Sequence, residues 1–336
     1  MKTESTGSVR VDLLGGTLDL SPINLILPEV ITINLATSLK ASAIIEKADI
    51  AGVEIVSIDY GTSQVFTSQD FSPEKFSNGF FGPLNFVAQI LFELKFISGA
   101  KITLKSGSPA GAGLGGSSTM GMTLYKGIRK FQNQDLDQKH ALTVIKGIEA
   151  KCLDAGPTGY QDYYPALYGG VLALKANVGG VIVEQLFDDE LKSVLENHLT
   201  LVYSGITRNS GINNWEVYKS FFDDKGDVRA GLEKIAKLSY EAYQAILDRN
   251  WSKFIHSIKL EGAIREKLFP GIVCIEVKSL FLELQKKYSG LGLKVCGAGG
   301  GGCFLIIHDA DAGKKVKEMI RTKGMSVLDF HVEAPL

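Results

Sequence analysis

The chain has 336 residues, a formal net charge of -1, and hydrophobic and charged contents of 45% and 22%. This is the profile of a globular protein, and the balanced charge argues against a nucleic acid or a membrane as partner. The N-terminus lacks the apolar stretch of a signal peptide, and no apolar run reaches the roughly 20 residues that span a bilayer. We therefore expect a cytoplasmic protein of two domains or one large one.

Strands and helices alternate in the first half of the chain. Alternating polar and apolar residues predict strands at 8–14, 30–43, 53–58 and 101–105. Apolar residues at helical spacing predict helices at 81–96, 116–131 and 138–153. Two short apolar runs, 171–174 and 181–186, flank Gly179 and Gly180 and indicate a hairpin.

The second half begins with a strand at 199–203 and continues with a long helical stretch at 214–287, interrupted near 223–226 and 270–271. Strands at 294–296 and 303–307 enclose a glycine run, and a helix at 312–322 and a strand at 325–332 follow. The change of pattern near residue 185 predicts an N-terminal domain at 1–185 and a C-terminal domain at 186–336.

Glycine is the one unusual component, with 37 residues gathered mainly in 107–121 and 290–302. The first cluster follows a predicted strand and opens a predicted helix, where unpaired N–H groups and the helix dipole attract an anion. Gly111, Gly113, Gly115 and Gly116 let the main chain approach phosphate oxygens. The hydroxyls of the two serines that follow offer a ligand to Mg²⁺. The pattern predicts a phosphate-binding loop.

Two common nucleotide motifs and a plain flexible loop fit these residues less well. A Walker loop requires a lysine that the sequence does not have. The spacing of Gly111, Gly113 and Gly116 matches a dinucleotide fingerprint, but the acidic residue expected about 20 residues later is missing. A flexible loop with a serine helix cap does not account for so many glycines at one strand–helix junction.

Three motifs resemble those of the GHMP kinases, the family of galactokinase, homoserine kinase, mevalonate kinase and phosphomevalonate kinase. They are RVDLLGGTLD (10–19), PAGAGLGGSST (109–119) and KVCGAGGGGCFLII (294–307), and the resemblance covers essentially the whole chain. It implies an α+β fold, with a β-α N-terminal domain that carries the nucleotide loop and a ferredoxin-like C-terminal domain. It also implies ATP and Mg²⁺ as cofactors. The implied nucleotide contacts are Pro109, Gly111, Gly113, Leu114, Gly115, Gly116, Ser117, Ser118 and Thr119.

The resemblance also implies roles for residues outside the loop. Asp162 matches the catalytic aspartate, and Arg10 is its expected partner. Glu149 matches an acidic Mg²⁺ ligand that would act with Ser117, and Asp154 is a nearby competitor. The residues expected at the substrate are Asp19, Thr158, Gly159, Gly299 and Gly300. The segment GGTL before Asp19 departs from close relatives, which carry a third glycine or a Glu-His pair, and leaves the sugar contacts open.

The acceptor is suggested by the segment LVYSGITRNS, which begins at Leu201. It resembles a segment of the heptose kinases, which phosphorylate the anomeric hydroxyl of D-glycero-D-manno-heptose 7-phosphate. Arg208 and Ser210 match its arginine and small residue, and an arginine in such a loop suits a substrate phosphate. A galactokinase-like kinase of free sugars and a non-catalytic sugar or nucleotide sensor are the alternatives. A small sugar or sugar phosphate is thus the expected partner, and a homodimer is left open.

Overall fold

The computed structural model describes residues 1–153, 158–206 and 212–336. Within these residues the first half of the chain forms a seven-stranded sheet in the order β4-β3-β5-β2-β6-β7, with β1 paired to β2. β3 and β5 run parallel, and the other neighbouring strands described in this sheet are antiparallel. The strands are β1 (Lys2–Leu14), β2 (Ile31–Lys47), β3 (Gly52–Ser57), β4 (Thr62–Thr67), β5 (Ala100–Lys105), β6 (Val171–Asn177) and β7 (Gly180–Gln185).

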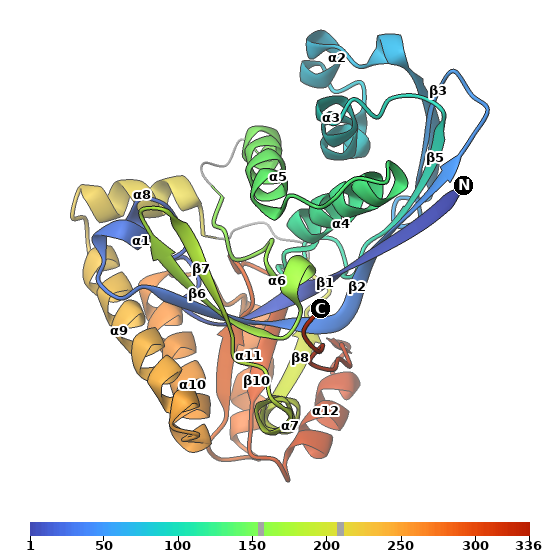
Figure 1. Ribbon diagram of the computed structural model, residues 1–336. Coiled ribbons are helices and arrows are strands. Elements are labelled where there is room, and N and C mark those ends of the chain that lie inside the picture. The colour runs from blue at the N-terminus through green and yellow to red at the C-terminus, as the bar shows by residue number, and fades with distance from the viewer. Residues whose placement is uncertain (154–157, 207–211) are drawn as a thin grey trace.

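The long hairpin of β1 and β2 runs through the molecule and connects its two ends (Figure 1). The C-terminal part of β2 pairs with β5 and the N-terminal part pairs with β6. The helix α4 (Gly116–Phe131) packs on both strands of the hairpin. Beside it lie α3 (Asn85–Glu93) and α5 (Gln138–Leu153), which enclose a core with α4 and the sheet. Short helices complete this half: α1 (Ile23–Ile26), α2 (Pro73–Ser77) and α6 (Pro165–Tyr168).

A four-stranded antiparallel sheet in the order β11-β8-β10-β9 organises the described residues of the second half. Its strands are β8 (Leu199–Tyr203), β9 (Gly292–Val295), β10 (Cys303–Ile307) and β11 (Ser326–Val327). Its helices are α7 (Asp189–His198), α8 (Asn214–Phe222), α9 (Val228–Leu247), α10 (Trp251–Leu268), α11 (Ile275–Gln285) and α12 (Gly313–Thr322). Helices α9 and α10 pack against each other along one side of the molecule (Figure 1).

The α+β fold with two sheet-based halves confirms the class expected from the sequence. The two halves share a hydrophobic core, because one buried cluster joins Leu13 and Ile33 of the first sheet to Leu201 and Leu305 of the second. β7 ends at Gln185. The division at 185/186 therefore falls after the last strand of the first sheet, and we retain it as a proposal. In the described residues no helix is long and apolar enough to span a membrane.

Three sequence predictions need correction. The helix expected at 81–96 is a short 3-10 turn at Gly82–Leu84 followed by α3. The long helical stretch has a further break at Arg249, which takes a positive φ of 54° before Asn250 caps the next helix. The final strand expected at 325–332 is reduced to β11, because residues 331–333 cross to the first sheet, where Val332 pairs with Thr37.

Candidate active site

The first glycine cluster joins β5 to α4 in a conformation that requires glycine. Gly111, Gly113 and Gly115 have φ values of 69°, 73° and 69°, a region that other residues avoid. Gly115 is the N-cap of α4, and no side chain within the described residues caps this end. The N–H groups of the first turn therefore remain available to an anion.

The second glycine cluster packs directly on this loop. The N–H of Cys303 donates to the carbonyl of Ala112 at 2.7 Å. A Cβ on Gly297 would lie 2.9 Å from the carbonyl oxygen of Gly113, and one on Gly302 would lie 2.7 Å from that of Gly111. The two backbones are in contact at Gly297 and Gly302, with no room there for side chains.

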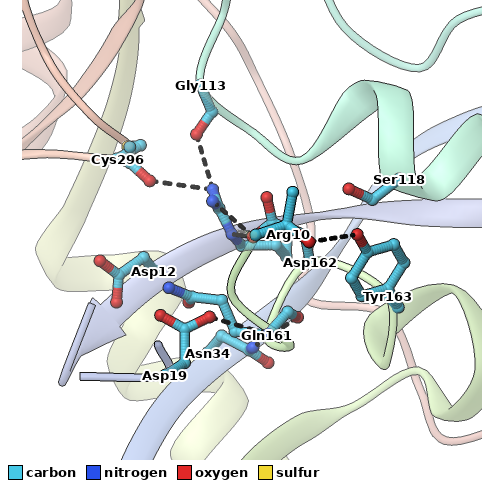
Figure 2. Close-up of polar contacts among 12 residues, drawn as sticks. Arg10, Asp12, Asp19, Asn34, Gly113, Ser118, Gln161, Asp162, Tyr163 and Cys296 are labelled. Atoms are coloured by element: carbon cyan, nitrogen blue, oxygen red, sulfur yellow. Dashed lines mark hydrogen bonds and ion pairs between the residues drawn. The ribbon is translucent and has the colours of Figure 1, made fainter. Parts of the chain in front are cut away.

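Arg10 connects the two glycine clusters to Asp162 (Figure 2). Its Nε donates to Asp162 Oδ1 at 2.8 Å, and its Nη1 donates to the carbonyls of Gly113 and Cys296 at 2.6 and 2.9 Å. The Arg10 side chain is 5% exposed and that of Asp162 is 31% exposed. The expected pair thus forms, with the arginine buried and the carboxylate open to ligands.

Asp162 lies directly against the start of α4. A Cβ on Gly115 would come within 3.2 Å of Asp162 Cγ, so a side chain at position 115 would crowd the carboxylate. Next to Asp162 along the chain, the Tyr163 hydroxyl donates to Glu149 Oε2 at 2.8 Å. The acid, the helix start and Glu149 therefore share one small region.

Glu149 is a buried carboxylate at the same helix end. Ser118 Oγ donates to its Oε2 at 2.7 Å, and the nearby Ser117 side chain also favours its charged form. Burial raises the pKa of Glu149, against the opposing effect of these hydrogen bonds. Burial likewise raises the pKa of the Tyr163 phenol, which keeps it a donor. Ser117 itself is exposed, and Ser118 is the serine that lines the cavity described below.

Asp19 occupies the opposite side of the site. Its carboxylate accepts from the Gln161 N–H at 3.0 Å. Burial, and then the nearby charge of Asp162, raise its pKa to about 6. A Cβ on Gly159 would fall 1.9 Å from Asp19 Oδ2, so only glycine fits beside this carboxylate.

These groups surround one cavity of about 440 Å³. Predicted site residues that line it are Arg10, Asp19, Gly113, Gly115, Ser118, Glu149, Thr158, Gly159 and Asp162. Gly297 and Ala298 of the third motif also line the cavity. Gly299 and Gly300, expected at the substrate, pack instead against Ile272. The remaining loop residues, Pro109, Gly111, Leu114, Gly116, Ser117 and Thr119, do not line this cavity.

Two of the residues predicted to contact the nucleotide could do so only through their backbone atoms. The side chains of Leu114 and Thr119 are fully buried, and the Leu114 carbonyl accepts from the Arg10 N–H at 3.0 Å. Arg208, Ser210 and Asp154 lie outside the described residues.

Sequence reasoning missed a group of buried charges beside the cavity. Lys294 Nζ donates to Asp12 Oδ2 at 3.1 Å and to Glu261 Oε1 at 2.8 Å. Arg265 lies one helical turn after Glu261 on α10 and lines the cavity with Asp12. The available signals were the alternation that puts Asp12 on the same face of β1 as Arg10, and the four-residue spacing of Glu261 and Arg265.

Known protein families match both halves of this arrangement. The model of the GHMP kinases N-terminal domain matches residues 84–170, and that of the GHMP kinases C-terminal domain matches residues 233–325, together more than half of the chain. The first match contains the glycine loop and Asp162, and the second contains the glycine run that packs on it. The chain belongs to the GHMP kinase superfamily.

Individual relatives are distant. The chain is 25% identical over 333 residues to a bifunctional fucokinase/GDP-fucose pyrophosphorylase of Arabidopsis thaliana, a match that covers 93% of this chain and 30% of that protein. It spans about a third of the length of the curated relatives it matches.

Two solved structures share the fold over nearly their full length. A D-glycero-D-manno-heptose 1-phosphate kinase of Bacteroides thetaiotaomicron has a TM-score of 0.75 at 19% identity, covering 100% of this chain and 97% of that one. Galactokinase of Lactococcus lactis, complexed with galactose, has a TM-score of 0.77 at 14% identity, covering 100% and 95%.

Proposed function

We propose that this protein is a sugar kinase that transfers the γ-phosphate of ATP to a sugar hydroxyl. The observation that carries the proposal is the place of Asp162, fixed by Arg10 and in contact with the glycine N-cap of α4. Because a phosphate bound at that helix start would face the carboxylate, acid and phosphate meet in the same cavity. Phosphoryl transfer depends mainly on such positioning and on charge stabilisation.

Each side of the cavity has a separate task in this proposal. The N–H groups at the start of α4 bind the phosphates. Asp162 orients the attacking hydroxyl and accepts its proton, while Arg10 keeps the carboxylate in one direction. Asp19, held by the Gln161 N–H on the other side, binds a hydroxyl of the acceptor.

The donor set suits Mg²⁺ that is bound together with a nucleotide. Magnesium prefers oxygen ligands and in phosphate sites takes one or two carboxylates, with phosphates and waters completing the shell. Glu149 and the hydroxyls of Ser117 and Ser118 supply such oxygens beside the helix start. In the described part of the chain no group of three His, Cys, Asp or Glu residues could hold a metal ion. The metal would neutralise charge on the transferred phosphoryl group.

Two kinds of acceptor are candidates. The segment with Arg208 and Ser210 favours the anomeric hydroxyl of a heptose 7-phosphate, and the likeness to a heptose 1-phosphate kinase supports a heptose as the acceptor. The likeness to a fucokinase protein and to galactokinase favours an uncharged sugar. Both kinds are polyhydroxylated and would use the same phosphate loop and acid.

An ADP-release screen tests the proposal. The full chain is incubated with ATP, with and without Mg²⁺, and with heptose 7-phosphate, L-fucose, galactose, mannose or mevalonate. We expect metal-dependent ADP release with at least one sugar and none with mevalonate. If ATP and a sugar bind without ADP release, the chain is a sensor with this fold, and the kinase proposal is wrong.

A further inference from the structure

The turn that presents Asp19 to the cavity is strained. Thr17 has a φ of 76°, which is a strained conformation for a β-branched residue. The neighbouring Gly15 also has a positive φ, of 78°. Such strain is maintained only when the surroundings determine the conformation, so the groups that contact this turn must hold it in place.

Buried charged groups hold the start of the turn, at Gly15. Glu261 Oε2 accepts from the Gly15 N–H at 2.7 Å, and Glu261 Oε1 accepts from Lys294 at 2.8 Å. Lys294 also donates to Asp12 at 3.1 Å. Lys294 and Glu261 are fully buried, and Asp12 is 1% exposed. The start of the turn is therefore attached to a rigid group of ion pairs.

Arg265 holds the middle of the turn. Its Nη1 donates to Thr17 Oγ1 at 3.3 Å and its Nη2 donates to the Gly297 carbonyl at 3.2 Å. A Cβ on Gly16 would lie 2.8 Å from Arg265 Nη1 and 2.1 Å from Asp12 Oδ2, so the glycine leaves space for both charged groups. Arg265 thus links the strained turn to the third glycine motif.

We propose that Arg265 is a positioning residue, which, with Asp12, Glu261 and Lys294, keeps the 15–19 turn in its strained conformation and aims Asp19 at the acceptor. The inference rests on the proposed function in assigning Asp19 to the acceptor. Arg265 is 2% exposed and its Nη atoms donate to Thr17 and Gly297, so it acts through the turn. The phosphate loop is held directly by Arg10, whereas Arg265 reaches it only indirectly, through Gly297. We therefore expect a much smaller effect on nucleotide binding than on acceptor binding.

Kinetics on a sugar that the wild type accepts provide the first test. Arg265→Lys keeps the charge but loses the planar fork that spans Thr17 and Gly297. We expect the KM for the acceptor to rise about 10–100-fold, the effect of misplacing a binding group by about 1 Å, with the KM for ATP changed less than about twofold. Arg249→Lys, at an exposed arginine paired with Asp188, is the matched control and should change neither constant.

Thr17 provides a second pair of variants that alters no charge. Thr17→Val removes the hydroxyl that Arg265 contacts, whereas Thr17→Ser keeps it. We expect the valine variant to repeat the rise in acceptor KM and the serine variant to restore the wild-type value. Equal effects on the KM values for acceptor and ATP, or wild-type behaviour of both Arg265→Lys and Thr17→Val, would overturn the inference while leaving the kinase proposal intact.

A measurement without substrate separates the two proposals. The free energy of unfolding is measured as a function of pH with and without the substitution Asp19→Asn, once in the wild type and once in Thr17→Val. In each background, the pH dependence of the difference between the two chains reports the pKa of Asp19. The ionisable groups that act on Asp19, or on which it acts, are Arg10, Asp12, Lys146, Tyr160 and Asp162, and all remain in both backgrounds. If Thr17→Val lets the turn relax, the pKa of Asp19 should move from about 6 toward the ordinary value of an aspartate. An unchanged pKa would refute the positioning role even if no sugar is phosphorylated.

Discussion

Replacing Asp19 by Asn should stabilise the protein at neutral pH and have less effect in acid. The Asp19 carboxylate is 4% exposed and accepts a hydrogen bond from the Gln161 N–H. Burial, and then the like charge of Asp162, raise its pKa to about 6. The folded protein therefore keeps a proton on Asp19 at pH values where the unfolded chain has lost it.

The sign and size of the effect follow from this difference. The folded state binds more protons than the unfolded state between about pH 4 and 6, so the contribution of Asp19 to stability is lost as the pH rises through that interval. A shift of about two pH units corresponds to roughly 3 kcal/mol at 1.36 kcal/mol per unit. Asn does not ionise, so its stability does not fall as the pH rises through this interval. The stability of Asp19→Asn relative to wild type should thus improve by about 2–3 kcal/mol between pH 4 and pH 7.

Urea unfolding of both chains at pH 4, 5, 6 and 7 measures this difference. Contributions from other ionisable groups, including Glu149, largely cancel in the comparison. Asp329→Asn, at an exposed aspartate paired with Lys317 and Arg321, is the control, because exposed ion pairs contribute little to stability. A stability difference between Asp19→Asn and wild type that stays constant from pH 4 to pH 7 would show that Asp19 is ionised normally in the folded protein.

Three further substitutions test the site. Asp162→Asn should lower ADP release by about 10²–10⁴-fold and leave ATP affinity, measured by calorimetry, nearly unchanged, because the amide cannot accept the hydroxyl proton. Gly159→Ala should raise the KM for the acceptor and spare that for ATP, because its Cβ would lie 1.9 Å from Asp19 Oδ2. Arg10→Met should cost about 3–5 kcal/mol in urea unfolding, because it leaves Asp162 and two carbonyls without their charged partner.

Each of these results could come out differently. Near-normal turnover of Asp162→Asn would remove this aspartate from catalysis. A rise in the KM for ATP as large as that for the acceptor in Gly159→Ala would mean that Asp19 does not belong to the acceptor side. An Arg10→Met chain as stable as the wild type would show that the network around Arg10 contributes little to the fold.

The sequence predicted most of what depends on local pattern. The limits of α4, α5 and β8 agree with the prediction because each has clear periodicity and a glycine or polar boundary. The strand β4 was missed because its residues are mostly exposed and polar, with only Phe66 buried. The helix α7 was missed although Asp188 caps it, because it is short and half polar.

The site was predictable only in part. Resemblance to the family brought Arg10 and Asp162 together across 152 positions of sequence, and the structure shows the ion pair. The pairing of Asp12 with Lys294 spans 282 positions, and no local pattern distinguishes a buried lysine in a strand from an exposed one. The contacts of Arg265 and the strain at Thr17 likewise appear only when α10, β1 and the last glycine run are packed together.

The hydrogen bonds of Arg10 have a consequence for synthesis on the ribosome. The guanidinium needs the Cys296 carbonyl, and residues 331–333 complete the edge beside β2. A nascent chain that has emerged only as far as β7 would contain the phosphate loop. Arg10 would still lack its Cys296 acceptor, and β2 would still lack the bridge to Val332. We therefore expect the loop to reach its final conformation only near the end of translation, and separate expression of residues 1–185 should yield a fragment that binds nucleotide poorly.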